Sequence, residues 1–99
     1  MGMFNVLVAV RADRTHIEYN LALELEHIVG PWMEGRFDWY AIGVEWWGFS
    51  AYIDPEDGWD DDWDDEDNPR PAGEFQEKFA KWQANPPSGY VLVPIRCHG

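Results

Sequence analysis

The chain has 99 residues, of which 45% are hydrophobic and 16% aromatic, and its formal net charge is -12. This content of apolar and aromatic residues excludes a disordered chain, and the length suits one domain with a single core, so we expect residues 1–99 to form one domain. The negative charge disfavours direct binding to nucleic acid and makes basic proteins the natural partners.

The sequence also bears on the cellular setting. No apolar run approaches the ~20 residues that a membrane span needs, so we expect no membrane association. The apolar start, residues 1–10, lacks the basic region and the cleavage site of a signal peptide. Cys97 is the single cysteine, which excludes a disulfide framework and favours the cytoplasm.

The first half of the chain predicts a strand and a helix. Residues 4–10 are short, β-branched and almost wholly apolar, which is typical of a central strand or one covered on both faces. Thr15 and Glu18 have the spacing of a capping box, so a helix is expected from there to about Val29, before Gly30-Pro31 ends it. Its buried stripe comprises Ile17, Leu21, Leu25 and Ile28.

The second half predicts three strands and another helix. Residues 37–42 and 46–53 are expected to form a hairpin that turns near residues 43–45. A helix is expected from about Ala72 until Asn85-Pro86-Pro87, and the last strand covers residues 90–95. The buried stripe of this second helix comprises Phe75, Phe79 and Trp82.

The order β-α-β-β-α-β predicts an α+β fold of the ferredoxin-like kind, with two helices on one face of a sheet. In that plan the first and third strands are central and the last lies at an edge. Pro94 supports this arrangement, because proline is tolerated in edge strands. Residues 54–70 are then expected to form an acidic loop inserted between the third strand and the second helix.

Most of the negative charge lies in that one segment. The remainder of the chain contains nine acids and seven bases, so it is nearly neutral. The ten acids of the segment are Asp54, Glu56, Asp57, Asp60, Asp61, Asp62, Asp64, Asp65, Glu66 and Asp67.

The acidic segment has three interpretations. It is a solvated loop that adds solubility, or a decoy that imitates nucleic acid for a basic protein, or a weak cation site. An EF-hand is excluded, because counting from Asp57 puts Asp62 where glycine is required and Asn68 where glutamate is required. Trp59 and Trp63 would add apolar anchors to the decoy.

The segment FDWYAIGVEWWG, residues 37–48, resembles a DWYxIGGRWxG-like stretch of small uncharacterised proteins from phages and actinobacteria. Val44 and Glu45 depart from that pattern, which has glycine and arginine there, so Glu45 reverses a charge. The resemblance implies a phage-like origin, and hence a location in the cytoplasm of the host cell, but no activity.

No catalytic constellation is recognisable, so we expect no enzyme, no cofactor and no metal site. His16 and His27 are about 16 Å apart along one helix, too far to share a metal. Cys97-His98 lacks a second pair of ligands. The aromatic residues of the expected hairpin are divided between core and interface: Trp39, Tyr40, Trp46, Trp47, Phe49 and Tyr52.

The sequence therefore predicts a small acidic, phage-type protein that binds a basic surface of a host protein, as a nucleic-acid mimic or an inhibitor of a host or defence factor. The alternative is a module that binds a nucleotide or a cation through the acidic loop or the hairpin aromatics. The residues expected to bind the partner are Asp57, Trp59, Asp60, Asp61, Asp62, Trp63, Asp64, Asp65, Glu66, Asp67, Trp46 and Trp47.

Overall fold

The computed structural model describes residues 2–15, 18–44, 48–63 and 69–99. It is an α+β fold with two helices and a five-stranded mixed sheet. The strands are β1 (Met3–Arg11), β2 (Trp39–Ile42), β3 (Phe49–Asp54), β4 (Gly58–Asp61) and β5 (Tyr90–His98), and the helices are α1 (Glu18–Met33) and α2 (Glu74–Ala84), with a short 3-10 turn at Ala12–Arg14.

The sheet has the order β2-β5-β1-β3-β4. The prediction that the first and third strands are central is confirmed, since β1 pairs with β3 in parallel and neither lies at an edge. The predicted hairpin between β2 and β3 is wrong. β2 pairs with β5 at one edge, and β4, from the acidic segment, takes the place beside β3 that the ferredoxin-like order gives to β2.

β5 is not an edge strand, and Pro94 is accommodated in another way. The carbonyl of Pro94 accepts the Gly43 N–H at 3.0 Å, so the nitrogen of Pro94 also faces β2. The β2 ladder ends one residue earlier, at the pair Ile42 and Ile95. The missing N–H of Pro94 therefore falls where β2 has already ended, and no ladder hydrogen bond with β1 is lost.

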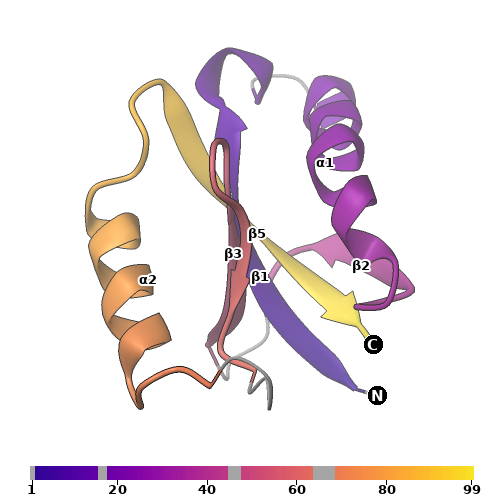
Figure 1. Cartoon of the computed structure of the whole chain (residues 1–99). Helices are drawn as coiled ribbons and strands as arrows, with labels where there is room; N and C mark the ends of the chain where they lie inside the picture. Colours follow the sequence, from indigo (N-terminus) through magenta and orange to yellow (C-terminus); the bar gives the residue numbers. More distant parts are fainter. Residues whose placement is uncertain (1, 16–17, 45–47, 64–68) are drawn as a thin grey trace.

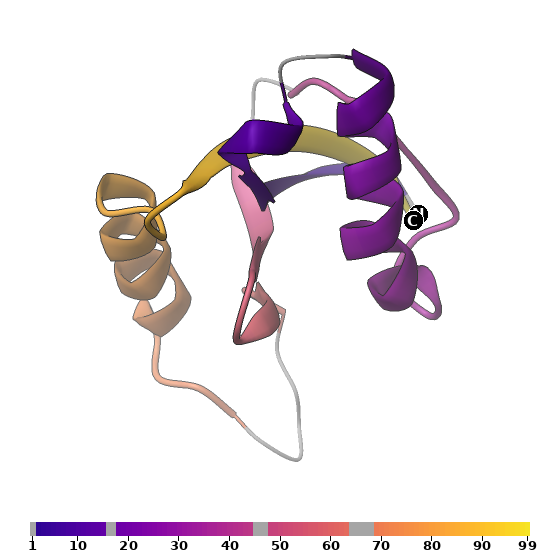
Figure 2. The same cartoon turned by 90° about the horizontal axis from the view of Figure 1, so that it is seen from above.

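The two helices lie on opposite faces of the sheet, so the prediction of two helices on one face is wrong (Figures 1 and 2). Val6, Val8 and Val10 of β1 pack with Leu25 and Val29 of α1. The alternate residue Leu7 packs in a second cluster with Tyr52 of β3 and Phe75 of α2. The unbroken apolar pattern of β1 follows from this burial on both sides.

α1 differs from its prediction at its C-terminal end. It continues through Gly30 and Pro31 to Met33, and Trp32 and Met33 pack against the core cluster of that face. Near the start, the Thr15 hydroxyl donates to the Ala12 carbonyl at 3.0 Å. The predicted capping box includes residues 16–17, which lie outside the described residues.

Candidate functional site

The acidic segment is not one continuous loop, because its first part forms a tight hairpin of β3 and β4. Asp54 Oδ2 accepts the N–H groups of Glu56 and Asp57, both at 2.9 Å. Asp54 Oδ1 accepts the indole N–H of Trp82 from α2 at 2.8 Å. Desolvation raises the pKa of Asp54, but these hydrogen bonds outweigh it and hold the pKa below its ordinary value. Asp54 therefore builds the turn and is not free for a partner.

Asp60 is neutralised by basic side chains beside α2. Its Oδ1 atom lies 2.6 Å from Arg70 Nη1, and its Oδ2 atom lies 3.4 Å from Lys78 Nζ. Desolvation raises the pKa of Asp60, but the Arg70 hydrogen bond and the two cations lower it below the usual range. Asp60 is thus part of the contact between β4 and α2.

The outer backbone edge of β4 is closed at Asp61. Because the Asp62 N–H points inward to the Ser50 carbonyl, the backbone groups of Asp61 point outward. The Asp61 N–H donates to Asp60 Oδ1 at 3.0 Å, and Arg70 Nη1 donates to the Asp61 carbonyl at 2.9 Å. Side chains of the protein therefore take up the hydrogen bonds that another strand would need here.

The two tryptophans of the segment have different surroundings. Trp59 is half-buried against the core cluster of the α1 face and donates its indole N–H to Asp61 Oδ2 at 2.5 Å. The guanidinium of Arg36 lies 5.2 Å from the centre of its ring. Trp63 stacks on Trp59 with ring centres 5.9 Å apart, and 43% of its surface stays exposed. Trp59 is thus part of the core, and Trp63 is available to a partner.

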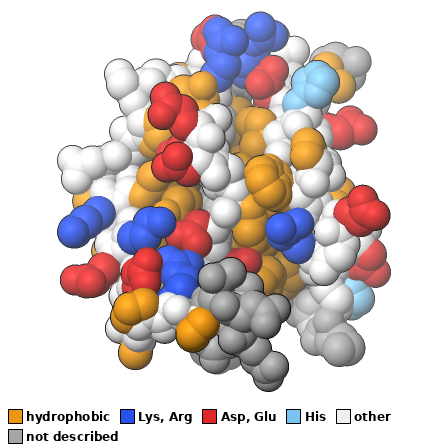
Figure 3. Space-filling view, in the orientation of Figure 1, with side chains coloured by type: hydrophobic (Ala, Val, Ile, Leu, Met, Phe, Trp, Pro, Cys, Tyr) orange, Lys and Arg blue, Asp and Glu red, His pale blue; other side chains and the backbone are white. Residues whose placement is uncertain are grey.

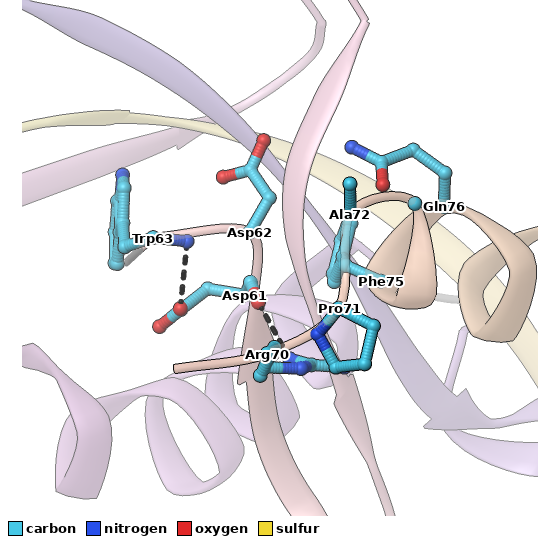
Figure 4. A pocket seen from close by; sticks show the side chains of 9 residues that line it. Asp61, Asp62, Trp63, Arg70, Pro71, Ala72, Phe75 and Gln76 are labelled. Atoms are coloured by element: carbon cyan, nitrogen blue, oxygen red, sulfur yellow. Dashed lines mark hydrogen bonds between the residues drawn. The ribbon is translucent and has the colours of Figure 1, made fainter. Parts of the chain in front are cut away.

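Asp62 stands beside Trp63 at a small cleft between the end of β4 and the start of α2 (Figure 4). The cleft has a volume of about 120 Å³, and its other walls include Arg70, Pro71 and Phe75. Desolvation raises the pKa of Asp62, and the neighbouring charge of Asp61 adds to the effect. Among the described residues, no base lies within ion-pair distance of Asp62.

A longer groove runs between α1 and the β3–β4 hairpin, with a volume of about 420 Å³. Its floor is apolar and includes Ile28, Trp32 and Ile53, and Glu24 and Glu56 line it as well. The space-filling view shows an apolar strip between the two helical layers, with acidic and basic side chains on both sides of it (Figure 3).

The predicted site residues therefore do not act as one set. Asp57 is exposed in the hairpin turn, about 17 Å along the strand from Asp62. Asp60, Asp61 and Trp59 have internal partners. Of the other predicted partner-binding residues, Trp46, Trp47, Asp64, Asp65, Glu66 and Asp67 lie outside the described residues.

Arg70, Lys78 and Arg36 were not predicted as part of the site. Arg70 and Lys78 meet Asp60 because β4 lies beside α2, and Arg36 meets Trp59 because β4 also borders the C-terminal end of α1. The i,i+4 spacing of Arg70 and Glu74 is a sequence signal for a basic group at the start of α2. No signal in the sequence pairs Arg70 with Asp60.

The histidine and cysteine near the C-terminal end lie in β5, next to the edge strand β2. His98 Nδ1 is 3.0 Å from Asp38 Oδ1, and its ring stacks on Trp39 with centres 5.5 Å apart. The hydrogen bond from His98 lowers the pKa of Asp38. Cys97 is fully buried, and desolvation raises the pKa of its thiol to about 12. Among the described residues, no group of three or more His, Cys, Asp or Glu side chains is arranged to hold a metal.

No protein-family model, curated protein or solved structure matches the chain. Within the described part of the chain, neither helix has the length and apolar character needed to cross a membrane. The likeness of residues 37–48 to phage and actinobacterial proteins stays a prediction.

Proposed function

We propose that the protein binds a basic surface of another protein through the outer side of the β3–β4 hairpin. The proposal rests on a difference among the acids of the segment, because some have partners within the fold and others are exposed. Asp54, Asp60 and Asp61 are used within the fold, whereas Glu56, Asp57 and Asp62 are exposed. We call Glu56, Asp57, Asp62, Trp63 and the groove between α1 and the β3–β4 hairpin the hairpin surface.

The hairpin surface combines charge with an apolar anchor. Exposed carboxylates attract a basic partner over a distance of about a Debye length and orient it. Trp63 offers a large exposed ring next to Asp62, and tryptophan is enriched among the residues that dominate binding energy. The groove floor supplies apolar area for side chains between the partner's basic groups.

The proposed target is a nucleic-acid-binding protein of a bacterial host, such as a host or defence factor. A protein that binds phosphates has the basic surface that the carboxylates require. The phage-like segment at residues 37–48 is consistent with an inhibitor of this kind. A nucleotide ligand has less support, because the carboxylates of the hairpin surface repel phosphates. A cation ligand has less support, because no group of three or more His, Cys, Asp or Glu side chains among the described residues is arranged to hold a metal.

The test is capture of proteins from a bacterial lysate by the immobilised chain, at low and then high salt. The double variant Asp57→Asn/Asp62→Asn should lose the captured protein. Glu26→Gln/Glu77→Gln is the matched control, because it also removes two exposed charges but lies outside the hairpin surface, and it should retain the captured protein. Duplex DNA in excess should release the protein if the surface imitates nucleic acid. Equal capture by the two double variants would rule out the hairpin surface.

A further inference from the structure

β2 is an edge strand whose outer side is open, in contrast to β4. Because Gly43 N–H points inward to Pro94, the backbone groups of Tyr40 and Ile42 point outward. Within the described chain, no hydrogen-bond partner occupies these groups. Edge strands that proteins leave open are templates for pairing with another strand.

Exposed apolar side chains gather on and beside the same strand. Trp39, Ile42 and Val44 are exposed to 45%, 48% and 52%. Residues 38–44 include one charged side chain, Asp38. This run lacks the lysines that usually protect an edge, so its composition favours an interface.

We propose that β2 pairs antiparallel with β2 of a second copy of the chain, about a two-fold axis at Ala41, and joins the two sheets into one. Tyr40 of each copy then exchanges both backbone hydrogen bonds with Ile42 of the other. The pairing is self-complementary, because the same two residues supply the outward groups on both sides of the axis.

Side chains in this register fit one another on both faces of the sheet. On one face, Trp39 lies opposite Gly43 of the other copy, which has no side chain to displace. Within the described part of the chain, a Cβ added at Gly43 would meet the end of the flexible Arg96 side chain, at 4.0 Å, and no backbone atom. On the other face, Tyr40 lies opposite Ile42, an aromatic and β-branched pair that stabilises antiparallel strands.

The net charge of -12 does not oppose this pairing strongly. β2 and the acidic β4 lie at opposite edges of the sheet, four strand spacings or ~19 Å apart. The two acidic edges of the dimer are then ~43 Å apart, several times the ~8 Å Debye length at physiological salt. The charged side chain Asp38 lies opposite Val44, so no like charges face each other along the paired strands.

Sedimentation equilibrium of the full chain tests the proposal. The wild type should have twice the 11.5 kDa mass of the chain at high concentration and dissociate on dilution. Ile42→Lys should be monomeric, because it buries a lysine at the paired edge. Leu23→Lys, at a residue 44% exposed on α1, should remain dimeric. Circular dichroism should show that both variants are folded.

A cysteine scan tests the register. Ala41→Cys should form an intermolecular disulfide with oxidised glutathione, because opposite residues of a non-hydrogen-bonded pair have Cα atoms ~4.5 Å apart. Val44→Cys should not, because its two copies would lie ~20 Å apart along the strands. The native Cys97 is fully buried, so it should not form a competing disulfide in these variants.

A monomeric wild type at all concentrations would overturn the proposal. So would a dimer that survives Ile42→Lys and resists cross-linking through Ala41→Cys, which would place the interface elsewhere. A monomeric wild type that captures a lysate protein only when Ile42 is intact would also overturn it, and would assign the edge to a strand of another protein. The hairpin surface is at the opposite edge, so its own test does not depend on this result.

Discussion

The indole of Trp32 occupies the space that a side chain at Gly58 would need. A Cβ atom at Gly58 would lie 2.6 Å from Cζ2 of Trp32, and the φ of Gly58 is +76°. Trp32 packs against the core cluster of the α1 face, so it cannot move without disturbing that core. This close approach joins the C-terminal turn of α1 to the hairpin that begins the acidic segment.

Gly58→Ala should therefore destabilise the protein by about 2–4 kcal/mol, from the left-handed backbone conformation and the clash together. Gly35→Ala is the matched control, because Gly35 has a φ of +78° and open space where its Cβ would lie. It should cost only the conformational part, about 1–2 kcal/mol. Urea unfolding of the two variants measures both values. An equal loss for the two would show that Trp32 does not pack on Gly58.

The pairing of Asp60 with Arg70 and Lys78 should make stability depend on acidic pH. The pKa of Asp60 is lowered in the folded protein, so its contribution is present above the unfolded pKa near 3.8 and is lost as the pH falls through the folded value. Asp60→Asn should be less stable than the wild type at neutral pH, and the two should converge as the pH falls through the lowered pKa of folded Asp60. Unfolding in urea at several pH values measures the two curves. Asp13→Asn, at an exposed ion pair with Arg11, should change the curve little.

Tyr52 should set a limit to stability at alkaline pH. Desolvation, and then the negative charge of Asp60, raise the pKa of Tyr52 to about 12. In the unfolded chain Tyr52 has its ordinary pKa of 10.0. The stability that neutral Tyr52 contributes is therefore complete below that pH and is lost as the pH rises to about 12. The loss is on the order of 2 kcal/mol. Tyr52→Phe should show a flatter stability curve between these values. An unchanged curve would indicate that the hydroxyl of Tyr52 is not desolvated.

The layers of the fold could be predicted in part from the sequence. β1 is apolar at consecutive positions, which already indicates a strand covered on both faces, and the opposite placement of α1 and α2 satisfies that pattern. The prediction of the ferredoxin-like order is wrong because the acids Asp60 and Asp61 gave β4 the composition of a loop. Gly58 and Trp59 of the same strand lie against Trp32 and Arg36. Local pattern also could not reveal that β2 pairs with β5, since strands remote in sequence form that ladder.

The sequence locates the acidic segment, but it does not tell which of its acids are paired within the fold and which are exposed. Asp60 and Asp62 are identical in type and two residues apart, so alternation along the chain puts them on the same face and does not distinguish them. Only their neighbours do. Asp60 meets Arg70 and Lys78, whereas Asp62 stands beside exposed Trp63. If the dimer through β2 forms, the two hairpin surfaces lie at opposite ends of one sheet, which suits a target with two basic surfaces.

Cys97 should be unreactive as long as the protein is folded. Its thiol is fully buried in β5, and desolvation raises its pKa to about 12, so almost no thiolate exists at neutral pH. Labelling with a chromogenic disulfide reagent at pH 8 should be slow in buffer and fast in concentrated urea. The native rate should rise in Gly58→Ala about tenfold for each 1.4 kcal/mol of stability lost, because labelling then requires unfolding. Fast labelling of the native wild type would show that β5 opens locally at the pair of Cys97 with Tyr40, next to the edge proposed for dimerisation.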